Sequence, residues 1–414
     1  MTLMYLAPVD YVFTGHMSCP VTFAFSFTEQ LDPRKLERSL AELLTCIPWL
    51  GGRLRAVSEA ALAYEVEERP SVALSVTTTD KRFDELRDRD LVPLVKSFDG
   101  EVLMHARLTQ TPEGSALGVS MSHALVDGFS FFLAMQKWAA LTRGEQVEAP
   151  VMERLLRAPE SYVAAALSGL DERRLFENTG LFLSELRPEV ETLPRQERIS
   201  LSSAALAELF ADAQRSVDQK ITKNDVLTAW LWRTYGAQLW SDADNPDVYM
   251  SCPVDVRRLL GEENKNAFGC TINTATARAT RRELMHLSLG QLATRIQQSV
   301  SRVFASNPFE RVATLEALRR LHGLRGPQSI QLRHPQRGMV VTNMSRLPLA
   351  QLDFGCGAPT TARLVVEVSG MAAVLPARDG VAVTVYRDAD ATTKRPTPRA
   401  TALRKSPSDR TIRW

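Results

Sequence analysis

Hydrophobic and polar positions alternate in short runs along most of the chain, and segments with helical spacing separate these runs. Runs with a period of two predict strands, and segments that are apolar every third or fourth residue predict helices. Both halves of the chain contain both patterns, which predicts an α/β fold of mixed sheets with flanking helices. The predicted strands are Val21–Phe27, a segment around Leu54, Leu62–Val66, Val72–Val76, Val102–Leu108, Ala116–Ser122, Val248–Val254, Gly338–Thr342, Arg363–Val368 and Val381–Tyr386.

Capping residues mark where the predicted helices begin. Asp32 is the expected N-cap of a helix whose first residue is Pro33, and Pro48 ends that helix. The other predicted helices are Phe129–Leu141 ending near Gly144, one capped by Ser202, one capped by Thr222 with Asp225 at the N3 position, and one capped by Ser288 with Gln291 that runs to about Phe304.

A charged stretch with two prolines, residues 187–198, reads RPEVETLPRQER and is expected to link two domains. An ordinary surface loop is an alternative interpretation of the same residues. The expected division is an N-terminal lobe over residues 1–186 and a C-terminal lobe over residues 199–390. The tail, residues 391–414, carries a charge of +6 and few large apolar residues, so we expect it to be disordered.

Composition removes several classes of function. The formal charge of +2 over 414 residues gives no reason to expect a nucleic-acid partner. Five scattered cysteines without paired spacing fit a reduced, cytoplasmic protein, and the dispersed histidines do not predict a metal site. The N-terminus does not resemble a signal peptide, and apolar runs are too short for a membrane span. We expect a monomer.

The segment Gly118–Gly128 reads GVSMSHALVDG and holds the residues with the clearest chemical interest. His123 follows a predicted inner strand and precedes a predicted helix, a usual place for chemistry in mixed folds. A histidine can take and return a proton near neutral pH, so His123 is a candidate general base. A histidine satisfied inside the core is the plain alternative.

Four stretches in order along the chain resemble the BAHD family of acyl-CoA-dependent acyltransferases. They are LERSLAELLTCIPWLGGRL at Leu36–Leu54, HALVDG at His123–Gly128, PVDVRRLL at Pro253–Leu260 and DFGCG at Asp353–Gly357. NDVLTAWLWR at Asn224–Arg233 and VTNMSRLPLAQLDFGCG at Val341–Gly357 support them, and the resemblance covers roughly residues 5–388. It implies two lobes like those of chloramphenicol acetyltransferase, each a mixed sheet with helices, and an active-site channel between the lobes.

The resemblance also implies an activity: transfer of an acyl group from acyl-CoA to a hydroxyl or amine of a small molecule. His123 would be the general base, with Asp127 as the second residue of the catalytic motif. Asp127 either orients His123 or, as the family implies, pairs with Arg257 and holds the loop. Gly128 is expected to allow close packing or a positive φ. Acyl-CoA would be a co-substrate, with no permanently bound cofactor and no metal.

Other site residues are expected in the C-terminal part. Asp353, Gly355 and Gly357 are expected to shape a tight loop rather than to catalyse. Thr342 could hydrogen-bond the acceptor or the tetrahedral oxyanion, and Asn343 could supply a further donor.

The chain departs from the family where Cys356 and Met344 replace tryptophans, and in the basic tail. These departures keep two alternatives open: a condensation-like enzyme served by an acyl carrier protein, and a non-catalytic binding member of the fold.

Overall fold

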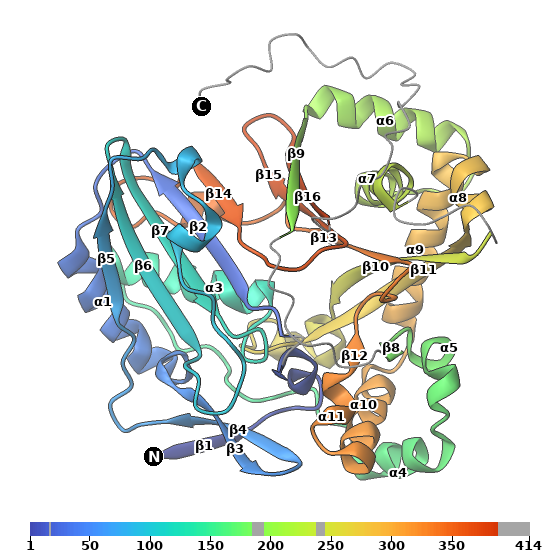
Figure 1. Ribbon diagram of the computed structural model, residues 1–414, viewed down its shortest axis with the longest axis horizontal. Helices are drawn as coiled ribbons and strands as arrows, with labels where there is room; N and C mark the ends of the chain where they lie inside the picture. The colour runs from blue at the N-terminus through green and yellow to red at the C-terminus, as the bar shows by residue number, and fades with distance from the viewer. Residues whose placement is uncertain (16–17, 184–193, 237–244, 388–414) are drawn as a thin grey trace.

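The computed structural model describes residues 1–15, 18–183, 194–236 and 245–387. Two large sheets, each with its own helices, lie side by side (Figure 1). The expected tail, residues 391–414, lies outside the described residues, as do residues 187–193 of the expected linker. The prediction of a linker is wrong for Arg195–Arg198. These residues form the start of strand β9 (Arg195–Leu201), which pairs with strand β16 (Val381–Arg387) of the second sheet.

The first sheet has five strands in the order β14-β2-β7-β6-β5. Its central strands β2, β7 and β6 are antiparallel neighbours, and β5 lies parallel to β6. Helices α1 and α3 pack against each other beside this sheet. The ring centroids of Phe131 and Phe132, both on α3, lie 5.2 and 5.0 Å from that of Phe23 on β2. The strands are β14 (Thr361–Leu364), β2 (Val21–Phe27), β7 (Gly114–Met121), β6 (Met104–Thr111) and β5 (Leu74–Thr78), and the helices are α1 (Pro33–Cys46), the short α2 (Asp88–Leu91) and α3 (Gly128–Thr142).

The second sheet has six strands in the order β11-β10-β13-β15-β16-β9. Strand β13 is parallel to both of its neighbours, and the remaining pairs are antiparallel. A buried apolar cluster joins this sheet to α6, α7 and α9. The elements not yet bounded are β11 (Ile272–Thr280), β10 (Asp247–Asp255), β13 (Gly338–Asn343), β15 (Met371–Pro376), α6 (Ser203–Arg215), α7 (Lys223–Leu231), α8 (Arg281–His286) and α9 (Leu289–Ala305).

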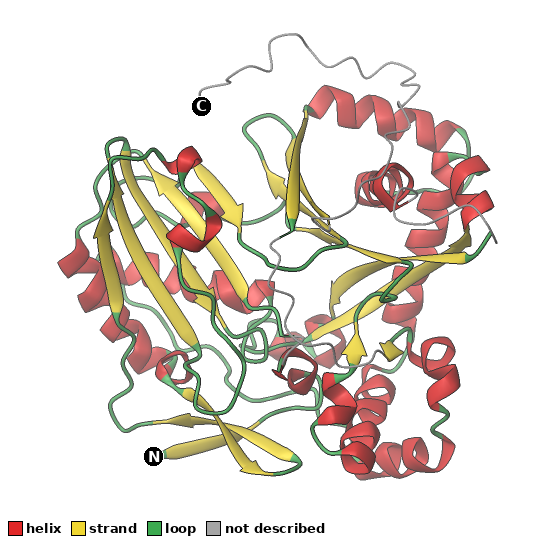
Figure 2. Cartoon of the chain, viewed as in Figure 1, coloured by secondary structure: helices red, strands yellow, loops and turns green. Residues whose placement is uncertain are grey.

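Smaller elements fill the base of the molecule, below the two sheets in Figure 2. Helices α4 and α10 pack against each other there. A three-stranded sheet in the order β1-β4-β3 lies near the N-terminus. These elements are β1 (Thr2–Tyr5), β3 (Arg53–Ser58), β4 (Ala61–Val66), α4 (Glu160–Gly169), α5 (Leu175–Thr179), α10 (Pro308–His322), α11 (Arg325–Gln328) and the strand pair β8 (Phe182–Leu183) with β12 (Ile330–Gln331).

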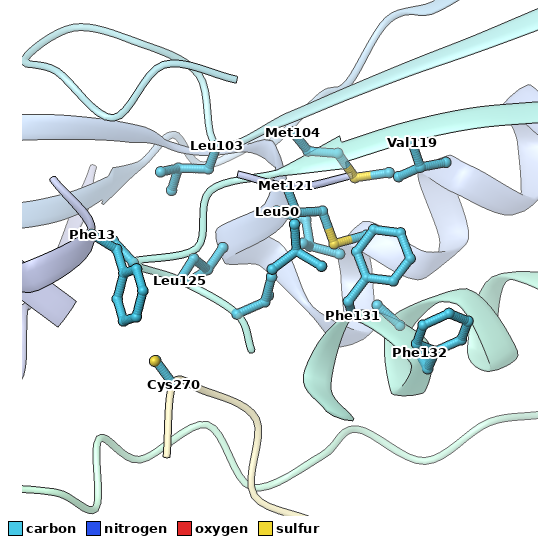
Figure 3. Packing of buried hydrophobic residues seen from close by; sticks show 14 of the residues in the cluster. Phe13, Leu50, Leu103, Met104, Val119, Met121, Leu125, Phe131, Phe132 and Cys270 are labelled. Atoms are coloured by element: carbon cyan, nitrogen blue, oxygen red, sulfur yellow. The ribbon is translucent and has the colours of Figure 1, made fainter. Parts of the chain in front are cut away.

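One strand crosses the expected boundary between the lobes. Strand β14 comes from the C-terminal half, yet it pairs antiparallel with β2 at the edge of the first sheet. The predicted strand Arg363–Val368 is wrong in its bounds, because the observed strand covers Thr361–Leu364 and the following residues are not a strand. The largest apolar cluster also contains residues of both halves. Figure 3 shows part of it, with Phe13 and Leu125 on the same side of the cluster as Cys270.

Candidate active site

His123 lies in a tight turn between the central strand β7 and the helix α3. The backbone N–H groups of Leu125 and Val126 both donate to the carbonyl of Ser122, each at 3.0 Å, and this closes the turn. The residue His123 is partly exposed, although the Nδ1 atom of its ring is buried and has no hydrogen-bond partner among the described residues. The ring of Phe13 stacks on it with centroids 3.9 Å apart and planes 5° from parallel. The turn therefore presents one histidine, held flat against an aromatic ring.

Burial controls the protonation of His123. It lowers the pKa of the imidazole below its usual value, while the backbone of the turn and the Asp127 charge act weakly in the opposite direction. The imidazole is therefore neutral at physiological pH, the form that can accept a proton.

Asp127 does not orient His123. It is the N-cap of α3, where its carboxylate accepts from the backbone N–H of Ser130 at 2.9 Å and from that of Thr271 at 3.0 Å. Both carboxylate oxygens also bind Arg257, each at 2.8 Å. Burial would raise the pKa of Asp127, but the Arg257 guanidinium and the hydrogen bonds outweigh it and hold the pKa below its usual value. The expected pairing of Asp127 with Arg257 is confirmed.

Arg257 ties together segments from both halves of the chain. Its side chain is 2% exposed, and beyond Asp127 it donates to Ser130 Oγ and to the backbone carbonyls of Ala267 and Gly269. It also contacts Asp255 at 3.0 Å. A buried guanidinium is stable only when its donors are satisfied, as they are here. The pair therefore fixes the start of α3, and with it the turn that carries His123.

The expectation for Gly128 is wrong. Its φ is not positive, and a Cβ atom built there would have no neighbour within 4 Å. Gly128 is the first residue of α3, so its backbone is helical and needs no glycine.

A second buried ion pair holds the same turn, and sequence reasoning missed it. Arg154 donates to the carbonyls of Leu125 and Ala124 at 3.1 and 3.2 Å, and the Tyr64 hydroxyl donates to Ala124 at 2.7 Å. Asp10 lies 3.4 Å from Arg154, and burial raises the pKa of its carboxyl to about 6. The isolated Asp10 and Arg154 carried no local signal, because 144 positions separate them in the sequence.

The loop Asp353–Gly357 is closed by hydrogen bonds between its own residues. Asp353 accepts from the backbone N–H groups of Gly355 and Gly357 at 2.7 and 2.8 Å. Both glycines have positive φ, +94° and +89°, which favours glycine over other residues. Phe354, the residue after Asp353 in this loop, is buried, and its ring packs against the ring of Trp138 on α3. The loop thus attaches the C-terminal half to the helix that follows His123.

Thr342 and Asn343 lie at the end of β13, with Thr342 partly buried and Asn343 exposed. The Asn343 amide is held by its neighbours: its nitrogen donates to Asn224 at 2.5 Å, and its oxygen accepts from the Ser345 backbone at 2.9 Å.

Strand β11 contributes residues to the lining of two hollows, and Phe13 lines one of them. A small one of about 20 Å³, the inner cavity, is lined mainly by apolar side chains from both halves, among them Phe13, Leu156 and Val256. A larger one of about 1010 Å³, the outer cleft, lies between β11, α4, α5, α9 and α10. His123 lines neither of these two, but Phe13, which covers its ring, lines the inner cavity.

The described residues hold neither a metal-binding cluster nor a membrane-spanning helix. No group of three or more His, Cys, Asp or Glu side chains there could hold a metal ion. Nor does any helix among the described residues have the length and apolar character to cross a membrane.

Two mixed sheets with flanking helices, and a histidine turn between a central strand and a helix, define a two-lobed α/β architecture. A model of the Transferase family matches residues 2–388, and the chain belongs to this family, the BAHD acyltransferases. A hydroxycinnamoyl-CoA:5-hydroxyanthranilate N-hydroxycinnamoyltransferase of Avena sativa is 27% identical over 84% of this chain and 82% of its own length. Hydroxycinnamoyltransferase 2 of Oryza sativa subsp. japonica is 25% identical over the same shares.

Solved structures show the same fold at low identity. TRI101 of F. graminearum, complexed with coenzyme A and deoxynivalenol, has a TM-score of 0.75 at 16% identity over 94% of this chain and 96% of its own. The first condensation domain of the calcium-dependent antibiotic synthetase has a TM-score of 0.63 at 18% identity over 94% and 92%.

Proposed function

We propose that the protein transfers an acyl group from acyl-CoA to a hydroxyl or amine of a small acceptor, with His123 as the general base. The observation that carries this proposal is the contrast between His123 and Asp127. The Asp127 carboxylate is fully engaged by Arg257, Ser130 and Thr271, whereas His123 is neutral and partly exposed in a turn held by two buried ion pairs. Such a fixed, titratable group suits proton transfer.

The chemistry follows from the state of the imidazole. Neutral His123 removes the proton of the acceptor as its oxygen or nitrogen attacks the thioester carbonyl. The tetrahedral intermediate then collapses, the carbon–sulfur bond breaks, and the imidazolium returns its proton to the leaving thiolate. Because Nδ1 is buried, we assign this proton transfer to Nε2. Thr342, partly buried at the end of β13, is our candidate donor to the oxyanion.

The relatives suggest which donor to test first. Curated relatives from Avena sativa, Oryza sativa and Narcissus pseudonarcissus are named as hydroxycinnamoyltransferases, so a hydroxycinnamoyl-CoA is the first candidate donor. The fold likeness to a condensation domain keeps an acyl carrier protein as the alternative donor.

The test is thiol release from p-coumaroyl-CoA with a panel of alcohols and amines, set against the same acyl group loaded on a carrier protein. We expect release of free CoA with formation of the ester or amide. Turnover only with the loaded carrier would contradict the CoA proposal, and no turnover with either donor across the panel would favour a binding role.

A further inference from the structure

The inner cavity and the outer cleft meet at three residues. Asn273 and Thr274 of β11 and Arg311 of α10 line both hollows. These three polar side chains, the junction, therefore lie between the outer cleft and the apolar lining of the inner cavity, which includes Phe13. A molecule at the inner end of the outer cleft would therefore contact side chains that also line the inner cavity.

Arg311 is an unusual cation in this setting. Its only hydrogen bond to the described residues runs from Nη1 to the backbone carbonyl of Thr274 at 3.1 Å, and it forms no ion pair with them. Two other arginines of the cleft have carboxylate partners: Arg278 binds Asp247, and Arg295 binds Glu283. Burial lowers the pKa of Arg311, yet a guanidinium stays charged at neutral pH. The junction thus carries one partly buried positive charge with unused donors.

Thr274 adds a second unused polar group at the same place. The residue is 4% exposed, and its Oγ1 atom is buried without a hydrogen-bond partner among the described residues. Buried polar atoms are seldom left unpaired, because desolvation then costs free energy with no return. Since Arg311 donates to the carbonyl of this same residue, both unused groups belong to one site.

The junction leads toward the proposed base. Phe13 lines the inner cavity and stacks on His123, so contiguous side chains connect the cleft with the imidazole. We propose that Arg311 and Thr274 form an anion subsite for the acyl acceptor, and that the acceptor carries a carboxylate bound there. This inference rests on the proposed acyltransferase function. A guanidinium matches a carboxylate through two parallel N–H donors, and the threonine hydroxyl adds a third.

A single charge favours the acceptor over the donor as occupant. Coenzyme A carries several phosphates, whereas Arg311 is the only cation among the three residues that form the junction. Arg302 is the remaining arginine in the lining of the outer cleft. It is exposed to solvent and is not one of the junction residues.

The experiment uses the full chain, p-coumaroyl-CoA and matched acceptors: 3-aminobenzoate with 3-aminobenzamide, and 3-hydroxybenzoate with 3-hydroxybenzamide. We expect the wild type to prefer each acid over its amide. Arg311→Gln should raise the KM of the acids at least about tenfold and leave the KM of the amides and of acyl-CoA unchanged. Arg311→Lys should restore part of the preference, and Thr274→Val should raise the KM of the acids severalfold.

Arg320→Gln is the control, because Arg320 is exposed on the same helix outside the cleft lining and carries the same charge. This substitution should leave the KM of all four acceptors unchanged. An equal loss for acid and amide in Arg311→Gln, a change confined to the KM of acyl-CoA, or no acid preference in the wild type would overturn the subsite. If the wild type releases no thiol, the proposed function fails, and calorimetric titration with 3-aminobenzoate decides the subsite alone. Weaker binding to Arg311→Gln than to wild type supports the subsite, and equal binding rejects it.

Discussion

The rings of Phe13 and His123 lie face to face, with centroids 3.9 Å apart and planes within 5°. Phe13 belongs to a short 3₁₀ helix, Asp10–Phe13, whose first residue pairs with Arg154. The same short segment thus covers the imidazole and, through Asp10, supports the arginine that binds the turn. The N-terminal segment is therefore part of the candidate active site.

The pH dependence of kcat/KM should show this environment. A base whose pKa is lowered loses activity only when pH falls through that lowered pKa, so the acidic limb should inflect below pH 6.5 with a plateau near pH 7. Phe13→Ala exposes the ring to water and should move the inflection up toward 6.5. An inflection at or above pH 6.5 in the wild type would argue against this account.

Loss of the imidazole should slow catalysis strongly without unfolding the protein. We expect His123→Ala to lower kcat about 10²–10⁴-fold in the thiol-release assay, the usual contribution of a positioned base. Thermal melts should stay close to wild type, because the ring forms no ion pair with any residue that the structure describes. His105→Ala, on strand β6, is the matched control and should keep its activity. Full activity in the His123 variant would exclude it as the base.

The two aspartates that contact Arg257 should differ sharply when each is neutralised. Asp127→Asn leaves a buried guanidinium without its main counter-charge, so we expect a loss of about 3–5 kcal/mol in the free energy of unfolding. Asp255 binds the same arginine, but its side chain is 46% exposed, so Asp255→Asn should cost at most about 1 kcal/mol. Urea denaturation measures both, and equal losses would show that burial does not set the difference.

Two glycines beside the site offer a second paired test. Gly128→Ala should change stability by no more than about 0.5–1 kcal/mol, since its Cβ points into open space at a helical φ. At Gly269 a Cβ would lie 2.5 Å from Nη1 of Arg154, which the carbonyl of Leu125 holds in place. Gly269→Ala should therefore lower the melting temperature by several degrees and reduce activity. A tolerant Gly269 would mean that Arg154 is free to move.

Local signals allowed the helix starts to be predicted from the sequence. Asp32, Thr222 with Asp225, and Ser288 with Gln291 cap the helices that they were expected to begin, because an N-cap is decided within four residues. Strand β15, which reads MAAVLP, was missed, since its small residues and its proline give no β-rich alternation. Its strand character comes from pairing with β13 and β16.

The candidate site divides in the same way. His123, Asp127 and Arg257 were expected because they lie in motifs that a family resemblance makes visible, and the ion pair was found where it was expected. Four other residues of the site could not be predicted from the sequence: Phe13, Asp10, Arg154 and Arg311. The role of the first three depends on partners more than a hundred positions away, and that of Arg311 depends on a cavity. No window of sequence contains that information. The glycine beside Asp127 was misread for a related reason, since its backbone angle is set by the helix it begins.

The position of strand β14 in the sequence determines when the first sheet can be completed during synthesis. Residues 361–364 complete the edge of a sheet whose other strands end by residue 121, so a ribosome must synthesise about 240 more residues before β2 gains its last partner. Until then the growing chain exposes an open strand edge, the kind of surface that promotes aggregation. Truncation before β14 should consequently yield insoluble protein rather than a free-standing first lobe.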